Sequence, residues 1–346
     1  MERLPEKLPE LLLAWYEKNR RDLPWRRDRE AYHVWLSEVM LQQTRVEAVK
    51  GYYERFLREL PTVAALAEAD PDRLAKLWEG LGYYSRMRNL QKAARAVMQE
   101  HGGVFPSAFE EIRALPGIGD YTAGAIGSIC FELPTPAVDG NVLRVLSRLM
   151  EDAEPVTKQT VKKEYTDRLR EIYPAGRCGD FTQALMELGA TVCVPNGAPL
   201  CESCPLRALC GAADNGTQME YPVKEAKKPR RKEEKTVFFL RAGTLCALSK
   251  RPEKGLLAGL WELPNVEGTM QAQQALERVE QWGVEPAELL KTAEKTHIFT
   301  HVEWKMRCYY VNCKAPAGAF TWVDQARFEQ DIALPTAFRM FWEELK

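Results

Sequence analysis

The sequence predicts two domains, the first all-α and the second α+β with strands dominating. From Leu8 to about Ala212, apolar residues recur at three- and four-residue spacing, which is the period of one helix face. After residue 235 the period changes to two, as in "TVFFLRAGTLCALSKR", "THIFTHVEWKMRCYYVNC" and "AFTWVD". The 346 residues also exceed the roughly 150 of an ordinary domain. We therefore place a helical domain at 1–213 and a second domain at 236–346.

Between them, residues 214–235 follow neither period and are polar, basic and proline-bearing. This composition predicts an exposed linker. Its charges are either simply solvated or able to touch a phosphate backbone. Two helical stretches, "MQAQQALERVEQWG" and "PTAFRMFWEELK", accompany the strands of the second domain.

Bulk properties narrow the classes of function. The formal net charge is −1, so affinity for a polyanion must come from local patches. No apolar run approaches the ~20 residues that cross a bilayer, and we expect no membrane partner. The first residues lack the order of a signal peptide, which predicts a cytoplasmic protein. We expect it to act as a monomer.

Four of the nine cysteines form a cluster in the sequence. Cys193, Cys201, Cys204 and Cys210 have the spacing C-x7-C-x2-C-x5-C. Four thiolates this close together are suited to a tetrahedral zinc or a [4Fe–4S] cluster. A zinc ribbon repeats the C-x2-C pair and this chain has one, which favours the iron–sulfur cluster. Between the last two cysteines, Arg207 either contacts a phosphate or is a solvated surface residue.

The stretch "LPGIG" lies between two predicted helices. Gly117 and Gly119 allow backbone conformations closed to other residues, and the N–H groups that open the second helix can bind an anion. Taken alone, the motif is equally consistent with a tight helix connection.

Two acids are candidates for catalysis. In "VDGNVLRVL", either Asp139 or Asn141 can cap the helix that follows, which would leave a spare side chain beside the hairpin. In "YHVWLSEVMLQQT", Glu38 interrupts an apolar helix face. An acid in that setting has a raised pKa and holds a proton near neutral pH. The alternative is a half-exposed Glu at the edge of the face.

Taken together, these motifs resemble the adenine DNA glycosylases, a family of helix–hairpin–helix enzymes with an iron–sulfur cluster. The resemblance is carried, in this order, by "LPWR", "WLSEVMLQQT", "GLGYYSRMRNL", "LPGIGDYTAGA", "VDGNVLRVLSR", "QALMELGA" and the four cysteines. It covers essentially the whole chain. The first cysteine interval departs from the family, having seven residues where six are usual.

The resemblance implies a base excision repair enzyme that acts on double-stranded DNA. Its target would be adenine opposite 8-oxoguanine or G, extruded from the duplex into a pocket. Glu38 would protonate N7 of the adenine, and Asp139 would stabilise the oxocarbenium-like sugar or trap it covalently. Such a protein would be associated with the nucleoid while on DNA. Its cofactor would be a [4Fe–4S] cluster on the four cysteines.

A tyrosine distinguishes this chain from the related endonuclease III family. There a lysine at the place of Tyr121 attacks the sugar and cuts the strand through a Schiff base, which a tyrosine cannot form. The resemblance therefore implies a monofunctional enzyme that leaves an abasic site, with Tyr121 near the reacting sugar. Asn141 would hold Asp139 or a water molecule. The alternatives are a bifunctional glycosylase and lyase for oxidised pyrimidines, and a non-enzymatic iron–sulfur DNA-binding protein.

The resemblance also assigns binding residues. It puts one group around the adenine and a second group at the gap and the opposite base, where an aromatic side chain can wedge between bases. Some relatives have Glu at the place of Gln183. The adenine group is Trp25, Arg26, Leu41 and Gln183, and the second group is Gln43, Thr44, Leu81 and Tyr83, with the hairpin glycines Gly117 and Gly119 on DNA.

The second domain resembles a Nudix fold without its catalytic acids. The stretch "LERVEQWGV" keeps Glu277 and Glu280 but lacks an arginine and a glutamate of the magnesium-binding box. This argues against a nucleotide pyrophosphatase and predicts a domain that recognises 8-oxoguanine. The family does this through a turn with Phe, Ser and His, which here is Phe299, Thr300 and His301. Threonine keeps the hydroxyl that can bond to the lesion.

Overall fold

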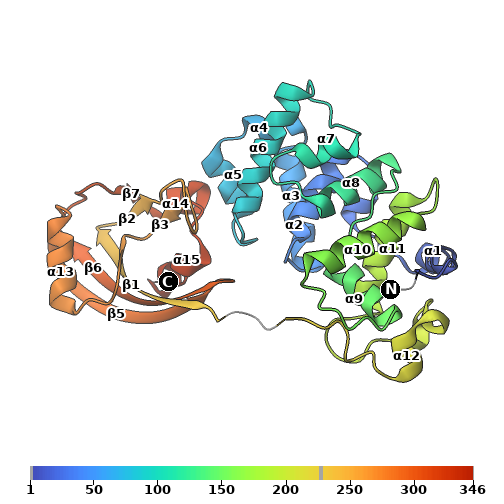
Figure 1. The fold of residues 1–346 in the computed structure, drawn as a ribbon. Coiled ribbons are helices and arrows are strands. Elements are labelled where there is room, and N and C mark those ends of the chain that lie inside the picture. Colours follow the sequence, from blue (N-terminus) through green and yellow to red (C-terminus); the bar gives the residue numbers. More distant parts are fainter. Residues whose placement is uncertain (1–2, 226–228, 346) are drawn as a thin grey trace. The chain divides into compact units, whose positions relative to one another are not determined.

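Helices form the N-terminal part of the chain and strands dominate the C-terminal part, as the sequence predicts (Figure 1). The structure, a computed structural model, describes residues 3–225 and 229–345. The chain divides into two units, Met1–Glu68 with Arg88–Ala226, and Ala69–Met87 with Lys227–Lys346. Among the described residues, no helix combines the length and the apolar character needed to cross a membrane.

Short helices joined by tight turns build the helical part. Many begin or end at residues with a clear local reason, such as Asp70, whose carboxylate caps the helix that starts at Pro71. In chain order they are α1 (Leu8–Asn19), η1 (Pro24–Arg26), α2 (Ala31–Leu41), α3 (Val46–Glu59), α4 (Val63–Glu68), α5 (Pro71–Trp78), α6 (Ser85–Glu100), α7 (Phe109–Ala114), α8 (Asp120–Phe131), α9 (Gly140–Leu149), α10 (Gln159–Glu171), α11 (Cys178–Thr191), η2 (Cys201–Ser203), η3 (Arg207–Leu209) and α12 (Gly211–Asn215).

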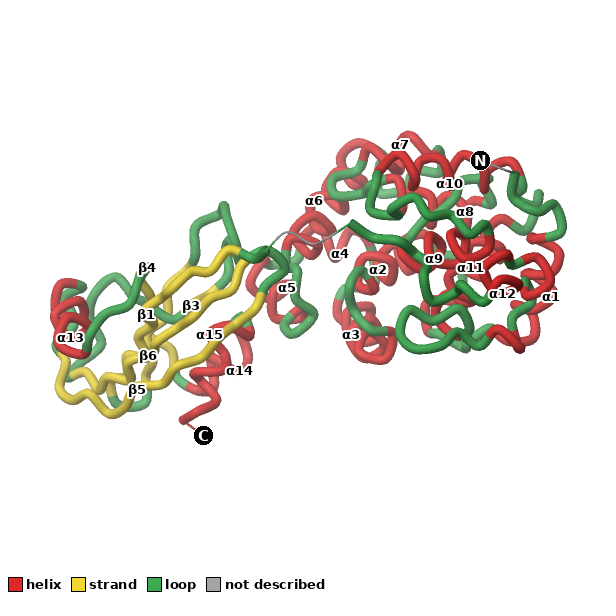
Figure 2. The backbone as a smooth tube through the Cα atoms, turned by 60° about the horizontal axis from the view of Figure 1, so that its bottom comes forward, coloured by secondary structure: helices red, strands yellow, loops and turns green. Residues whose placement is uncertain are grey.

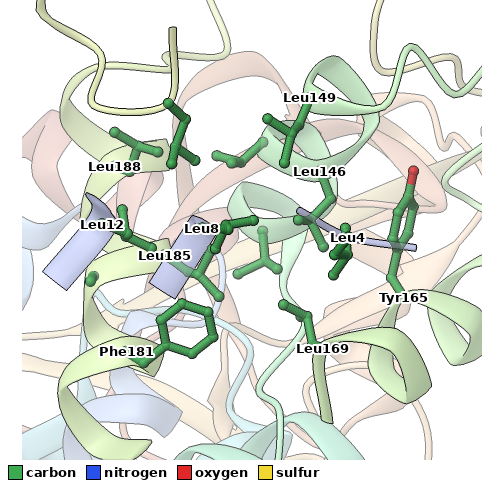
Figure 3. Packing of buried hydrophobic residues seen from close by; sticks show 14 of the residues in the cluster. Leu4, Leu8, Leu12, Leu146, Leu149, Tyr165, Leu169, Phe181, Leu185 and Leu188 are labelled. Atoms are coloured by element: carbon green, nitrogen blue, oxygen red, sulfur yellow. The ribbon is translucent and has the colours of Figure 1, made fainter. Parts of the chain in front are cut away.

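The core of this unit surrounds α9. Apolar side chains of α1, α9, α10 and α11 meet in one cluster, which includes Leu8, Leu146, Leu169 and Leu185, all at most 1% exposed (Figure 3). In α9 every residue from Val142 to Leu149 is buried. Because α9 is packed on all sides, its position is fixed. The side chains at its first turn are therefore held in place as well.

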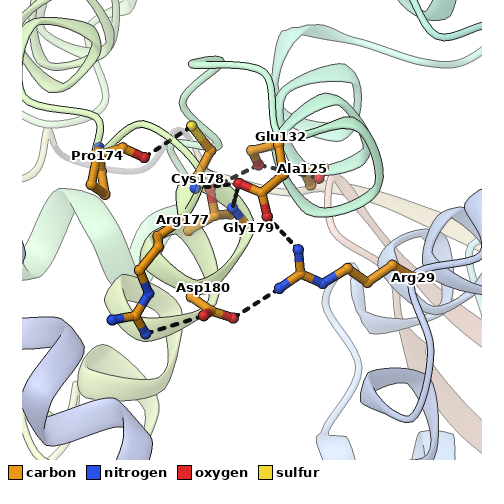
Figure 4. Close-up of polar contacts among 10 residues, drawn as sticks. Arg29, Ala125, Glu132, Pro174, Arg177, Cys178, Gly179 and Asp180 are labelled. Atoms are coloured by element: carbon orange, nitrogen blue, oxygen red, sulfur yellow. Dashed lines mark hydrogen bonds and ion pairs between the residues drawn. The ribbon is translucent and has the colours of Figure 1, made fainter.

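An ion-pair network joins the end of α8 to the start of α11 (Figure 4). Glu132 ends α8 in the left-handed region, with φ 52°. Its carboxylate accepts a 2.6 Å hydrogen bond from the backbone N–H of Cys178, an otherwise unpaired donor of the first turn of α11. Arg29 pairs with Glu132 and with Asp180, at 3.2 Å from the latter. The network thus holds two helices that border the candidate site described below.

A mixed sheet forms the C-terminal part, with β5, β6, β1 and β2 side by side (Figure 2). β1 runs parallel to β6 and antiparallel to β2 and β4. The elements are β1 (Arg231–Ala242), β2 (Leu245–Lys250), β3 (Trp261–Glu262), β4 (Asn265–Glu267), α13 (Ala272–Gln281), β5 (Pro286–Ile298), β6 (Val302–Cys313), β7 (Thr321–Val323), α14 (Gln325–Asp331), α15 (Thr336–Trp342) and η4 (Glu343–Leu345).

Helices cover both faces of this sheet. Val237 and Phe239 of β1 pack in a cluster with α14 and α15, whereas Phe238 and Leu240 pack in another cluster with α13. This explains the continuous apolar run "VFFL", because a strand buried on both faces has no polar side.

The strands extend beyond their predicted limits. β1 begins at Arg231, inside the segment assigned to the linker, because Arg231–Lys235 pair with Val302–Met306 of β6. The first part of β5 and all of α14 were not predicted. β5 is an edge strand with exposed residues at nearly every second position, so its sequence is too polar to show a buried face. Residues 226–228 of the linker lie outside the described residues.

The segment Ala69–Met87, which contains α5, belongs to the C-terminal unit. Lys76 donates to the backbone carbonyl of Ile332 at 2.9 Å. Glu79 accepts from the backbone N–H of Leu334 at 3.1 Å and pairs with Arg339 at 3.0 Å. These bonds span more than 250 residues of sequence, so periodicity along the chain gives no sign of them.

Candidate active site

A cavity of about 600 Å³ lies in the helical unit, among η1, α2, α8, α9 and α11. Adenine is a small bicyclic base, and a cavity of this size is typical of a ligand site. All the predicted catalytic and adenine-binding residues line it, together with two of the predicted opposite-base residues. They are Trp25, Arg26, Glu38, Leu41, Gln43, Thr44, Tyr121, Asp139, Asn141 and Gln183.

Glu38 lies in α2 and is 6% exposed. The hydroxyl of Tyr121, from α8, donates a 2.6 Å hydrogen bond to its Oε2. Burial is the main cause that raises the pKa of Glu38, and the nearby Asp139 adds to it, while the Tyr121 bond and the charge of Arg26 oppose the rise; the net pKa is about 7. Burial also keeps the pKa of Tyr121 well above 10, so the tyrosine remains a hydrogen-bond donor. Glu38 can therefore carry a proton near neutral pH.

Asp139 is itself the N-cap of α9. Its Oδ1 accepts from the backbone N–H groups of Asn141 and Val142, at 2.9 and 2.8 Å, and its Oδ2 accepts from the Asn141 amide at 2.7 Å. The sequence left open which of the two residues caps, and the structure answers with Asp139. Burial raises the pKa of Asp139, and these three donors oppose that rise. Because N–H groups bond best to an ionised acceptor, they favour the carboxylate.

A chain of hydrogen bonds leads from Asp139 through Asn141 to the cysteine loop. Asn141 accepts from the Arg144 guanidinium at 2.8 Å. The same guanidinium donates to the backbone carbonyls of Gly189 and Cys193, at 2.7 and 2.8 Å. The position of the Asp139 carboxylate is thus tied to both α11 and the loop that follows it.

Three charged residues of the cavity lining, Arg21, Lys162 and Glu187, were missed by sequence reasoning. Glu187 of α11 has a fully buried side chain and pairs with Arg21 and Arg26, at 2.6 and 2.8 Å. The available signal was a lone acid in the apolar stretch "ALMELGA". Lys162 of α10 also lines the cavity and brings an amine to it. On the apolar side, the Trp25 ring packs edge-on against Tyr53 at 5.6 Å.

The hairpin glycines lie between α7 and α8, apart from the cavity lining. Gly117 has φ 76°, and a Cβ there would lie 2.5 Å from the Asn89 Cβ, so only glycine fits. Gly119 precedes α8 as its N-cap, and a Cβ there would meet nothing within 4 Å. With φ −99°, this position could hold other residues, so only Gly117 of the two glycines has a backbone closed to them.

The four clustered cysteines converge. All four are free and line one small apolar cavity next to α9 and α11. Arg148 of α9 donates to the Cys193 sulfur at 3.3 Å. No set of three or more His, Cys, Asp or Glu side chains in the described part of the chain is arranged to hold a single metal ion.

The remaining predicted residues lie in the C-terminal unit. Tyr83, 46% exposed, and Thr300 share a hydrogen bond of 2.9 Å between their hydroxyls. Phe299, Thr300 and His301 form the turn between β5 and β6, and Thr300 and His301 are exposed. Phe299 is partly buried and packs edge-on against Trp304 at 4.8 Å, so it supports the turn. Leu81 is 6% exposed.

Two of the predicted opposite-base residues have unusual backbones. Gln43 and Tyr83 have φ of 58° and 46°, in the left-handed region that residues other than glycine seldom adopt. Such strain, held in place by the surrounding fold, concentrates at binding sites. By contrast, Glu277 and Glu280 of the incomplete Nudix box are exposed on α13.

Two family descriptions match the chain. Residues 36–171 match the HhH-GPD superfamily of base excision DNA repair proteins, and residues 236–344 match the NUDIX domain. The adenine DNA glycosylase of Rattus norvegicus is 36% identical over 97% of this chain and 74% of its own length. Those of Mus musculus and Homo sapiens are 38% and 36% identical over 95% of this chain, and 77% and 73% of their own lengths are covered.

Solved structures share the helical fold. A thermostable thymine-DNA glycosylase is 28% identical, with a TM-score of 0.55, over 61% of this chain and 97% of its own. A non-covalent endonuclease III–DNA complex is 23% identical, with a TM-score of 0.53, over 62% of this chain and 99% of its own.

Proposed function

Since this chain belongs to the adenine DNA glycosylase family, we propose that it excises adenine paired with 8-oxoguanine or G in double-stranded DNA, and that it is monofunctional. The observation that carries the proposal is the pair of acids in one cavity. The buried surroundings of Glu38 favour its protonated form, whereas the three N–H donors around Asp139 favour its carboxylate.

The first step is loss of the base. With the target nucleotide extruded into the cavity, Glu38 gives its proton to N7 of adenine. The N-glycosidic bond breaks, its electron pair goes to the base, and positive charge develops on the sugar. Asp139 stabilises that charge or bonds to the anomeric carbon. Water then adds at this carbon and its proton returns to a carboxylate, which leaves free adenine and an abasic sugar.

The side chains that line the cavity support monofunctional chemistry. Tyr121 stands where a lyase would need an amine, and its hydroxyl is engaged with Glu38. The alternative, a bifunctional enzyme, has one observation in its favour, because Lys162 lines the same cavity. Trapping with borohydride separates the two, since only an imine is reduced to a stable protein–DNA adduct.

Recognition of the pair would use the predicted gap and opposite-base residues. Gln43 and Thr44 at the cavity, Tyr83, and the turn Phe299–His301 would face the gap and the 8-oxoguanine, with Thr300 supplying the hydroxyl. Leu81 would support the loop from its buried position. Gly117 and Gly119 would present N–H groups to a phosphate. These contacts position the duplex and identify the lesion.

For the cofactor, we propose a [4Fe–4S] cluster held by Cys193, Cys201, Cys204 and Cys210, the cysteines that line one apolar cavity. Bound there, the cluster would supply a covalent cross-link between α11 and the loop that ends at α12. The seven-residue first interval is accommodated by a backbone bond from Leu200 N–H to the carbonyl of Val192, at 3.0 Å.

The test is single-turnover cleavage of a labelled duplex with A opposite 8-oxoguanine, with and without alkali, using the wild type and Glu38→Gln. Breaks that need alkali and vanish in the variant are the expected result. Breaks without alkali, together with borohydride trapping lost in Lys162→Ala, would establish the bifunctional alternative. No breaks with either protein would favour a non-enzymatic DNA-binding protein.

A further inference from the structure

We propose that Glu187 is a positioning residue, which fixes the Arg26 guanidinium at the wall of the adenine cavity and balances its charge. The inference rests on the proposed function, because it concerns the same cavity. It assigns a task to a residue that neither the motifs nor the predicted site had singled out.

The contacts of Arg26 depend on Glu187. One amino group of Arg26 donates to Glu187 Oε2 at 2.8 Å, and the other donates to the Arg21 carbonyl at 3.2 Å. The guanidinium also lies over the Tyr16 ring, 5.7 Å from its centroid. The Arg26 side chain is 14% exposed. Only one of these partners is an anion, so Glu187 alone can neutralise the charge of Arg26.

Glu187 needs no more than Arg21 for its own burial. Arg21 donates through its backbone N–H and Nε to Oε1, at 3.1 and 2.6 Å, and through its terminal amino group to Oε2, at 2.9 Å. This bidentate pair already satisfies both carboxylate oxygens. Glu187 therefore does not need the additional bond to Arg26 to compensate for its burial. That bond acts instead on Arg26, at the wall of the cavity.

The local charges make the arrangement important for Glu38. The groups that face Glu38 are Tyr121 from α8, Asp139 from the start of α9 and Arg26 from η1, and Lys162 from α10 lines the same cavity. Arg21, Arg26 and Glu187 form a corner of the cavity that carries one net positive charge. Replacing Glu187 by glutamine would leave two, and a positive charge near Glu38 favours its ionised form. The acid would then lose its proton at lower pH.

Loss of the anchor would also free Arg26 to change rotamer. A group displaced by about an ångström from its productive position can reduce a rate by roughly 100-fold. Two effects are therefore expected on Glu187→Gln, a slower excision step at every pH and a shift of the alkaline limb of the pH profile to lower pH.

A charge-balanced pair of variants separates these effects. Arg21→Gln with Glu187→Gln keeps the net charge of the corner, because one arginine and one glutamate are lost together. It still removes the anion that holds Arg26. The double variant should therefore regain the wild-type alkaline limb while its rate stays low. Arg21→Gln alone keeps the anion beside Arg26, so it should lose less rate than Glu187→Gln, and its alkaline limb should move to higher pH.

The experiment is the single-turnover excision rate on an A:8-oxoguanine duplex between pH 5 and 9, with duplex affinity and thermal stability measured in parallel. We expect a loss of 10-fold or more for Glu187→Gln, with duplex affinity unchanged, and partial recovery in Glu187→Asp. A wild-type rate, or an unshifted limb in Glu187→Gln, would overturn the inference. So would a rate loss in Arg21→Gln equal to that in Glu187→Gln, since this would mean a purely structural ion pair.

Failure of the proposed function looks different. An inactive wild type, or a fully active Glu38→Gln variant, would refute the glycosylase chemistry whatever Glu187 does. If Glu187→Gln folds too poorly to assay, the charge-balanced double variant decides the matter, because a wild-type rate in that protein would show that Arg26 needs no anchor.

Discussion

Glu38 and Asp139 are both buried acids, and they differ in what surrounds them. Glu38 receives a single hydroxyl donor, whereas Asp139 receives three N–H donors at the first turn of a helix. The start of a helix also favours a negative charge. This difference in local hydrogen bonding supports the proposed roles of the two acids, Glu38 as proton donor and Asp139 as charge stabiliser.

The raised pKa of Glu38 predicts a stability gain for the variant Glu38→Gln at alkaline pH. A folded-state pKa of about 7, against 4.5 for the free group, means that the wild type gains stability from this residue below pH 4.5. That contribution is lost as the pH rises through 7. A shift of this size corresponds to about 3 kcal/mol as an upper estimate. Glutamine does not ionise, so the variant escapes the loss.

The measurement is denaturant unfolding of both proteins at pH 5 and pH 8. Between these pH values, the free energy of unfolding of the variant should increase relative to that of the wild type by about 2–3 kcal/mol. Other titrating groups cancel in this comparison, because they are common to both proteins. An identical difference at the two pH values would show that Glu38 is ionised throughout.

At the scale of elements, α9 connects the candidate active site to the cysteine loop of the helical unit. Its N-cap is Asp139, and its next turns carry Arg144 and Arg148, which bond to the backbone and sulfur of Cys193. α11 packs so closely against its start that a Cβ on Gly189 would lie 2.6 Å from the Asn141 Cβ. The geometry of the active site is therefore sensitive to the distance between two helices.

Gly189→Ala should slow excision and destabilise the fold. The added methyl must push α11 from Asn141, at a typical overpacking cost of about 1–3 kcal/mol. Gly51→Ala in α3 is the matched control, because a Cβ there meets nothing within 4 Å. In that helix, alanine should stabilise by about 0.5–1 kcal/mol without changing the rate. Equal effects of the two substitutions on unfolding and on rate would contradict the proposed contact.

The β5–β6 turn gives a second prediction at this scale. Thr300→Val keeps the shape but removes the hydroxyl that bonds to Tyr83, so the rate ratio between A:8-oxoguanine and A:G duplexes should fall by about 10-fold, the equivalent of one hydrogen bond. Thr300→Ser, which keeps the hydroxyl, should preserve the ratio. A ratio unchanged in the valine variant would remove Thr300 from lesion recognition.

The sequence predicted elements best where one face is apolar. The helical domain and the central strands have clear periods, whereas β5 is a charged edge strand with no such face. Among site residues, the catalytic and adenine-binding candidates were named in advance from motifs and do line one cavity. Glu187 was missed, because a single acid in an apolar helix does not reveal its partners, and these lie 161 and 166 residues away.

For the whole molecule, the division into units does not follow the order of the chain. Residues Ala69–Met87 lie within the helical region of the sequence but belong to the C-terminal unit. In that unit the hydroxyls of Tyr83 and Thr300 share a hydrogen bond. Two distant parts of the sequence, both proposed to recognise the opposite base, thereby lie side by side. This cannot be read from local patterns, since Lys76 and Glu79 look like ordinary charges on an exposed helix face.

A chain ended at residue 226 should lose structure well before its new terminus. Lys76 and Glu79 would lose their bonds to Ile332, Leu334 and Arg339, and local opening of α5 would then cost less free energy. Hydrogen–deuterium exchange should show faster exchange in 71–78 than in the full chain, with α9 still protected. The preference for 8-oxoguanine over G should fall at the same time.

The control is Lys250→Ala in the full chain. It removes the exposed ion pair with Asp72 and the contact of the ammonium with the Trp261 ring. Each is worth about 1 kcal/mol or less, so exchange in α5 should stay close to that in the wild type. If α5 is equally protected in the shortened chain, residues 69–87 fold with the helical unit alone. Lesion preference would then depend on the turn at Thr300 without help from Tyr83. Faster exchange confined to α5 would instead show that one surface, made by both segments, recognises the opposite base.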